Sequence, residues 1–157
     1  MKINAHFMEY VDALPALLDQ LLACPAFNYD SSPPFPEVGG VYLFTEDGEH
    51  MYVGRTGNLR QRAGQHCRVS SGHNSAPFTF LLTREALGLP AANYRPGAGR
   101  DALMADLAFA AEFRNQNLRV NRMLIRYVQE EDPYVQTLFE VYCAVVLRTR
   151  YNDFNNH

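Results

Sequence analysis

The 157-residue sequence lacks several features that would assign it to a broad class at once. No apolar run approaches the roughly 18 residues that a membrane-spanning helix needs. Cysteine is scarce: Cys24, Cys67 and Cys143 lie far apart and form no Cys-x-x-Cys pair. Such cysteines are typical of reduced thiols and argue against a disulfide framework or a zinc site. Because acidic residues also interrupt the apolar N-terminal stretch, as they would not in a signal peptide, we expect a cytoplasmic protein.

Lysine is nearly absent, and acidic residues are absent from one long stretch. Lys2 is the only lysine among 14 basic residues, so arginine, whose planar guanidinium grips phosphate, dominates. Residues 50–84 contain five arginines and no Asp or Glu, whereas the rest of the chain has 9 basic and 17 acidic residues. A genomic preference for arginine codons would explain the composition, but less readily its clustering. The net charge of −3 therefore does not exclude nucleic acid, because salt screens distant charges beyond about 10 Å.

The remaining composition is that of a folded globular chain, with 47% hydrophobic and 20% charged residues. Apolar residues at helical spacing predict a helix over residues 4–24, divided at Pro15. Two β-prone runs, 40–44 and 51–53, flank an Asp-Gly turn and predict a hairpin. A helix from Leu59 to about Val69 should follow it, with Asn58 as its N-cap.

The second half of the chain predicts further helices and a strand. Residues 77–88 fit either a strand or a helix, residues 101–117 predict a helix, and residues 119–129 predict a third strand. The last helix should span about 134–147, with Asp132 as N-cap and Pro133 as its first residue. This helix is apolar nearly all round, so we expect it to be buried.

Two short motifs mark the predicted hairpin and the helix after it. The triplet Gly40–Tyr42 lies on the first strand and the triplet Tyr52–Gly54 on the second. Arg62 and His66 stand four residues apart on the next helix, which places them on one helix face.

The predicted last helix and the segment after it add two polar residues in apolar surroundings. Glu140 is the only acidic residue between Asp132 and Asp153, and Asn152 follows near the end of the chain. In this order and spacing, the features resemble the GIY-YIG nuclease family. Its signature is Gly-Ile-Tyr, then Tyr-Ile-Gly, then Arg and His on the next helix, a helical Glu and a terminal Asn. Val replaces Ile in both triplets here.

The resemblance covers roughly residues 39–69 and 119–153. It implies an α+β fold in which a small three-stranded antiparallel sheet is flanked by helices. We expect a single domain over residues 1–157, with an N-terminal helical extension at 1–38. Residues 70–118 exceed what a compact member needs and should form a mostly helical insertion.

The family resemblance also implies a reaction, the metal-dependent hydrolysis of a DNA phosphodiester. Tyr42, assisted by His66, would deprotonate the attacking water, and Arg62 would hold the phosphate. Tyr52 would orient the phosphate or the water, and the two tyrosines could exchange roles. Glu140 would bind a single Mg²⁺ or Mn²⁺, since one carboxylate suits an octahedral ion that keeps most of its waters.

Three further residues are expected to contribute to substrate binding. Arg55 follows the second triplet where family members often carry a basic residue, so it should contact phosphate. Gly54 allows close backbone approach at the end of the strand. Asn152 would fix Glu140 or the backbone near it, although an ordinary Asn at a helix end is the competing interpretation.

Each candidate residue also has an interpretation without catalysis. The tyrosines could be cross-strand core aromatics, and the arginine and glutamate could be solvated helix residues. A non-catalytic module that binds nucleic acid or protein and retains the GIY-YIG fold is therefore the alternative to an endonuclease. The expected partners are the DNA phosphate backbone, with a second copy of the chain or a specificity-giving protein, and no membrane.

Overall fold

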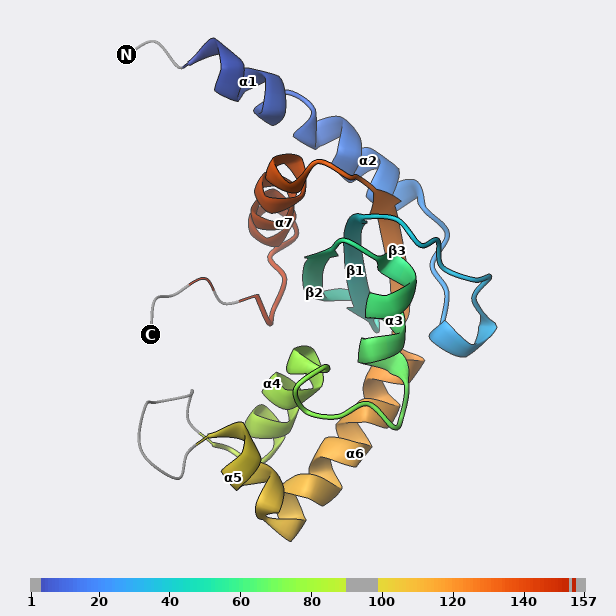
Figure 1. Cartoon of the computed structure of the whole chain (residues 1–157), viewed down its shortest axis with the longest axis vertical. Coiled ribbons are helices and arrows are strands. Elements are labelled where there is room, and N and C mark those ends of the chain that lie inside the picture. The colour runs from blue at the N-terminus through green and yellow to red at the C-terminus, as the bar shows by residue number, and fades with distance from the viewer. Residues whose placement is uncertain (1–3, 90–98, 153, 155–157) are drawn as a thin grey trace. The chain divides into compact units, whose positions relative to one another are not determined.

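The computed structural model describes residues 4–89, 99–152 and 154. Residues 90–98 of the predicted insertion lie outside the described residues. The chain divides into two compact units, one of residues 1–62 and 123–152, the other of residues 63–122 and 153–157. The elements in chain order, labelled in Figure 1, are α1 (Ala5–Val11), α2 (Leu14–Ala23), the 3₁₀ helix η1 (Tyr29–Ser31), β1 (Gly40–Glu46), β2 (Glu49–Thr56), α3 (Leu59–Cys67), α4 (Pro77–Ala86), α5 (Arg100–Ala105), α6 (Leu107–Arg122), β3 (Leu124–Gln129) and α7 (Pro133–Leu147).

The first unit is built on an antiparallel three-stranded sheet in the order β2-β1-β3. The central strand β1 places Tyr42 opposite Gly54 of β2 and opposite Tyr127 of β3. Phe44 follows Tyr42 by two residues and lies on the same sheet face, because side chains alternate along a strand. Tyr52 of β2 is paired with Phe44, so its side chain lies on this face as well. The hairpin and the three-stranded α+β fold predicted from the sequence are therefore confirmed.

The other sheet face forms the main hydrophobic core. Val41, Leu43 and Val53 are fully buried there and pack in one cluster with residues of α2 and α7. Leu21 of α2 and Phe139 of α7 are also fully buried in this cluster. Each such apolar side chain contributes roughly 1.5–3 kcal/mol when it is removed from water. These two helices therefore hold the sheet from the face opposite Tyr42.

The N-terminal helices follow the sequence prediction. The side chain of Asn4 accepts a hydrogen bond from the Phe7 N–H and caps α1. Pro15 lies in the first turn of α2, where the missing proline N–H costs no helical hydrogen bond. The expected N-terminal helical extension is thus present within the described residues.

The second unit is helical and has a small aromatic core of its own. Phe80 of α4 packs with Phe109 and Phe113 of α6 and with Ala76. Residues 77–86, which fit either a strand or a helix in sequence, form α4 with Pro77 in its first turn. The mostly helical character predicted for the insertion is confirmed over its described residues.

Two predicted elements have different boundaries in the structure. The third strand begins at Leu124 and not at residue 119, because α6 continues to Arg122 and buries Val120. The helix predicted over 101–117 is interrupted between α5 and α6. Asp106 lies at the break, where its carboxylate accepts a hydrogen bond from the Phe109 N–H and caps α6.

The prediction that the last helix is buried is wrong. Asp132 caps α7 and Pro133 opens it as expected, and one face packs on the sheet. The opposite face is open to solvent, since Tyr134 is 70% exposed and Val145 is 69% exposed. Apolar residues all round a helix therefore did not indicate complete burial here.

Among the described residues, no helix is long and apolar enough to cross a membrane. The single domain over residues 1–157 stays a prediction.

Candidate active site

Tyr42 and Tyr52 lie together on the sheet face opposite the main core. Their ring centroids are 6.4 Å apart with an interplanar angle of 44°. The Tyr42 ring lies over Gly54, and a Cβ atom built on Gly54 would overlap the Tyr42 ring and hydroxyl. The glycine of the second triplet is therefore needed for the position of the tyrosine of the first.

The start of α3 brings Arg62 to this pair of tyrosines. The Asn58 carboxamide oxygen accepts a hydrogen bond from the Gln61 N–H, and the Leu59 N–H donates to the Val38 carbonyl. These bonds fix the first turn of α3 against the strand entry. The Arg62 Nε then donates to the Tyr42 hydroxyl at 3.2 Å. The predicted phosphate-binding arginine and the predicted base are thus in direct contact.

Both phenols are held in their neutral form. Burial raises the pKa of Tyr42 well above its ordinary value, and the neighbouring Tyr52 raises it further. Arg62 opposes this shift, but not enough to cancel it. Burial likewise raises the pKa of Tyr52, with Glu140 adding to the rise and Arg62 opposing it. Neither hydroxyl can lose its proton near neutral pH without help.

Glu140 approaches β2 from the side of α7. The Arg55 Nε donates to the Glu140 Oε2 at 3.1 Å, across 85 residues of sequence. The Glu140 side chain is 20% exposed, and burial raises the pKa of its carboxyl, while Arg55 opposes the rise. Glu140 also contributes to the raised pKa of both tyrosines. The Glu140 charge therefore acts on Arg55 and on both tyrosines.

Asn152 binds the backbone of β2. Its side-chain oxygen accepts a hydrogen bond from the Val53 N–H at 2.8 Å, and its amide nitrogen donates to the Val53 carbonyl at 2.7 Å. The Tyr151 N–H also donates to the Met51 carbonyl. Because β2 is an edge strand, these bonds satisfy backbone groups that no strand pairs on that side. Asn152 was expected to fix Glu140 or the backbone near it, whereas these bonds hold β2 at Val53, between Tyr52 and Gly54.

His66 belongs to the second unit, whereas the other candidate residues belong to the first. It lies on α3 one turn after Arg62 and is fully buried. The first unit therefore brings together the two tyrosines, Arg62, Arg55, Glu140, Gly54 and Asn152.

Two features of the site were missed by the sequence interpretation. One is the ion pair of Arg55 with Glu140, since Arg55 was expected to contact phosphate alone. The other is the close packing of the Tyr42 ring on Gly54, where a Cβ atom would not fit. The first has no local sequence signal, because it depends on the packing of α7 against β2. The second follows from the hairpin register, which pairs the residue Tyr42 with Gly54.

The donor chemistry of this site suits one hard cation. Within the described ranges, no three His, Cys, Asp or Glu side chains gather as a metal cluster. The bond that the Glu140 carboxylate makes in the described structure goes through Oε2 to Arg55, which leaves Oε1 available as a ligand. Mg²⁺ accepts such a site, since it takes one or two carboxylate oxygens and retains several waters.

Comparison with known proteins supports the family resemblance. The profile of the GIY-YIG catalytic domain matches residues 38–85, a segment that includes both triplets, Arg62 and His66 and ends before Glu140. The chain is also similar to UvrABC system protein C from Deinococcus radiodurans, with 39% identity over 54 residues. That match covers 34% of this chain and 8% of the relative. No solved structure matches the chain significantly. The resemblance to the GIY-YIG family seen in the sequence is thus confirmed.

Proposed function

We propose that this protein is a metal-dependent endonuclease that hydrolyses phosphodiester bonds in DNA. The observation that carries the proposal is the contact of Arg62 with Tyr42 beside Tyr52, within the charge field of Glu140. Phosphodiester cleavage needs a cation on the phosphoryl oxygens, a group that takes a proton from water and a ligand for a metal ion. Arg62, the two tyrosines and Glu140 are proposed to supply these three chemistries in turn.

Arg62 is proposed to bind the scissile phosphate. A guanidinium carries a fixed positive charge and fits a phosphate with two hydrogen bonds. Through its Nε bond it also fixes the Tyr42 hydroxyl, so phosphate and phenol are positioned by one side chain. Arg55 is proposed to add a second cation for the substrate.

Tyr42 is proposed to take the proton of the attacking water once its own proton has been drawn off. Its raised pKa keeps the phenol protonated near neutral pH, so an acceptor for the phenol proton is required. The family resemblance assigns that task to His66, since an imidazole can serve as a proton acceptor. Tyr52 is proposed to orient the phosphate or the water, and the two tyrosines could exchange these roles.

Glu140 is proposed to hold a single Mg²⁺ or Mn²⁺ ion through its carboxylate. When bound, such an ion supplies Lewis-acid stabilisation of charge on the phosphoryl oxygens. Asn152 and Gly54 are proposed to act by position: Asn152 fixes the β2 backbone at Val53, and Gly54 leaves room for Tyr42. Both keep Tyr52 and Tyr42 in the geometry that the substrate meets.

The experiment is a plasmid-nicking assay with purified protein in Mg²⁺ or Mn²⁺. We expect the wild type to nick DNA, EDTA to stop it, and Glu140→Ala and Arg62→Ala each to abolish it. Arg60→Ala is the matched control. Arg60 lies on the same helix, is half exposed and pairs with Glu37, so nicking should persist. Cleavage that survives in EDTA or in both site variants would overturn the proposal.

The alternative is a non-catalytic binding module, and the Arg55–Glu140 ion pair favours it, since Arg55 already neutralises the proposed metal ligand. The same assay decides between the two functions. A binding module would reduce the mobility of DNA in a gel-shift experiment and would cleave no duplex, branched or single-stranded substrate.

A further inference from the structure

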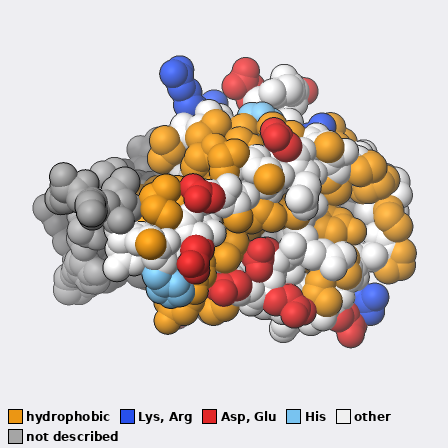
Figure 2. Space-filling view, turned by 90° about the horizontal axis from the view of Figure 1, so that it is seen from above, with side chains coloured by type: hydrophobic (Ala, Val, Ile, Leu, Met, Phe, Trp, Pro, Cys, Tyr) orange, Lys and Arg blue, Asp and Glu red, His pale blue; other side chains and the backbone are white. Residues whose placement is uncertain are grey.

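The outer face of α7 carries an apolar stripe that α1 covers in part: the Tyr134 ring packs edge-on against Tyr10, and Leu138 is partly buried, while the rest of the stripe is open. Tyr134, Leu138, Val141 and Val145 are spaced by four, three and four residues, the spacing of a helix-pairing seam. Three of them are exposed, at 70% for Tyr134, 41% for Val141 and 69% for Val145. Figure 2 shows one face of the molecule on which hydrophobic side chains gather, interrupted by separate Asp and Glu side chains. An apolar seam of this kind marks an interaction surface.

The seam is symmetric about its own midpoint. Tyr134 and Val145 lie at equal distances from the point between Phe139 and Glu140, as do Leu138 and Val141. Beyond the two ends of α7, the exposed residues Glu131 and Arg148 are separated from this point by equal numbers of residues along the chain. If two copies of α7 pack antiparallel about a two-fold axis at that point, each residue therefore meets its counterpart. Apolar residues meet apolar residues, and the acid of one copy meets the base of the other.

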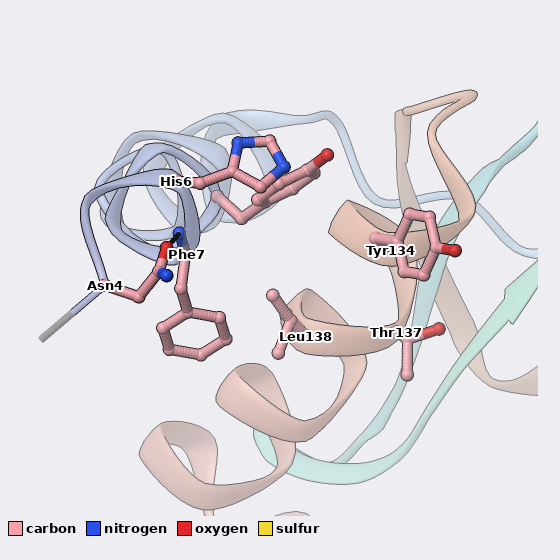
Figure 3. Close-up of a pocket in the computed structure, with 7 residues that line it drawn as sticks. Asn4, His6, Phe7, Tyr134, Thr137 and Leu138 are labelled. Carbon is pink, nitrogen blue, oxygen red and sulfur yellow. Dashed lines mark hydrogen bonds between the residues drawn. The ribbon is translucent and has the colours of Figure 1, made fainter.

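A pocket at one end of the seam adds shape to this pattern. It has a volume of about 630 Å³ and is lined by residues of α1 and α7, among them Phe7, Tyr10, Tyr134 and Leu138. In Figure 3, Phe7 projects from α1 beside Leu138 of α7, and Tyr134 lies on the same side of α7. The two-fold pairing brings Val145 of a second copy to Tyr134, which lines this pocket. Each copy then offers a pocket at one end of α7 and a valine at the other.

We propose that this face is the interface of a two-fold homodimer, in which the α7 helices of two copies pack antiparallel. A symmetric dimer needs a patch that is complementary to itself, and the seam meets that requirement in both shape and charge. Antiparallel packing also places the helix dipoles in opposite directions.

The dimer leaves the candidate active site open. Glu140 faces Arg55 on another side of α7 from the seam, so no seam contact covers it. The two-fold axis would point the two candidate active sites in opposite directions. The two strands of a DNA duplex also run in opposite directions, so each site would suit one strand. This consequence rests on the proposed nuclease function, whereas the dimer itself does not.

The first test is the mass of the full chain in solution by light scattering or sedimentation. We expect twice the 17.8 kDa of one chain for the wild type, and 17.8 kDa for Val145→Glu and Val141→Glu. Leu118→Glu is the matched control, because Leu118 is exposed to the same extent as Val141 but lies on α6 in the other unit. Circular dichroism checks that each variant is folded. A wild type that stays monomeric at its highest soluble concentration overturns the proposal, as does a folded dimer in both valine variants.

The second test reverses the flanking charges. Glu131→Arg and Arg148→Glu should each weaken dimerisation by about tenfold, since each creates two repulsive pairs at the rim. The double variant restores both pairs in exchanged form and should return the dimer to near its original affinity. Equal weakening in the double variant and the single variants would contradict the antiparallel pairing.

The third test fixes the orientation by cross-linking. In a Cys24→Ser background, a Tyr134→Cys copy mixed with a Val145→Cys copy should form a disulfide-linked pair, while Cys67 and Cys143 stay buried. The Val145→Cys copy alone should not, because antiparallel packing separates the two Val145 positions by 11 residues, about 16 Å of helix. Cross-linking of Val145→Cys with itself would indicate parallel helices and overturn the proposal.

Discussion

The two units of the chain differ in charge and in chemistry. The more basic unit would be expected to hold the residues proposed to bind phosphate, but it does not. The first unit has 7 basic and 12 acidic residues, and the second has 7 basic and 5 acidic. Yet the tyrosines, Arg62 and Glu140 all belong to the acidic first unit. The acid-free stretch of residues 50–84 divides at Arg62, so it is not one structural region. The proposed phosphate site therefore depends on Arg62 of α3 and Arg55 of β2, and the net charge of the unit does not reveal it.

The largest expected effect separates an arginine of the first unit from one of the second. Arg62→Lys keeps the charge but loses the Nε bond to Tyr42 and the two-pronged grip on phosphate. We expect DNA cleavage to fall by about 10²-fold. Arg114→Ala removes an exposed cation from α6 and should change cleavage by less than about threefold. Initial rates of plasmid nicking provide the measurement, and equal losses in the two variants would remove the contrast between the units.

The next effect compares two glycines of the first unit. A Cβ at Gly54 would overlap the Tyr42 ring, whereas a Cβ at Gly57 meets no atom within 4 Å. Gly54→Ala should lower the free energy of unfolding by about 1–3 kcal/mol, because the ring must move in a packed site. Gly57→Ala should be close to neutral. Chemical denaturation measures both changes, and a neutral Gly54→Ala would show that the Tyr42 position is not fixed by this contact.

The smallest effect concerns the stability that the first unit loses by burying Glu140, the proposed metal ligand. Because burial raises the pKa of Glu140, its ionisation favours the unfolded chain. The neutral variant Glu140→Gln should therefore unfold at a higher temperature than the wild type above this pKa, by roughly 2 °C. Below the ordinary pKa of 4.5 the two should coincide, and the gap should open as the pH rises through the raised pKa. Thermal melts from acid to neutral pH would contradict this if the gap closed as the pH rose.

Much of the first unit could be predicted from the sequence because its signals are local. The hairpin follows from two β-prone runs around a turn, and the start of α7 follows from Asp132 and Pro133. The candidate residues on the hairpin and α3 could be selected because their order and spacing resemble the GIY-YIG signature. Those signals required no knowledge of distant contacts.

The remaining features depend on packing that no local pattern encodes. The pairing of Arg55 with Glu140 joins residues 85 positions apart, and the exposed face of α7 results from where the sheet stops covering it. In the second unit, the boundary of α6 at Arg122 was missed because Val120 and its neighbours have strand propensity, which burial in a helix overrides. Propensity and periodicity therefore located most of the elements but not all of their boundaries, and the contacts at the candidate site depend on tertiary packing.

The most direct test of the central claim is a comparison of the wild type with Glu140→Gln, using cleavage of duplex DNA and binding of Mn²⁺ measured by electron paramagnetic resonance. We predict that the wild type binds Mn²⁺ and cleaves DNA. Glu140→Gln should remain folded, with the same far-ultraviolet circular dichroism, and should do neither. Cleavage by Glu140→Gln at the wild-type rate would contradict the assignment of Glu140, and a wild type that binds DNA but never cleaves it would contradict the nuclease itself.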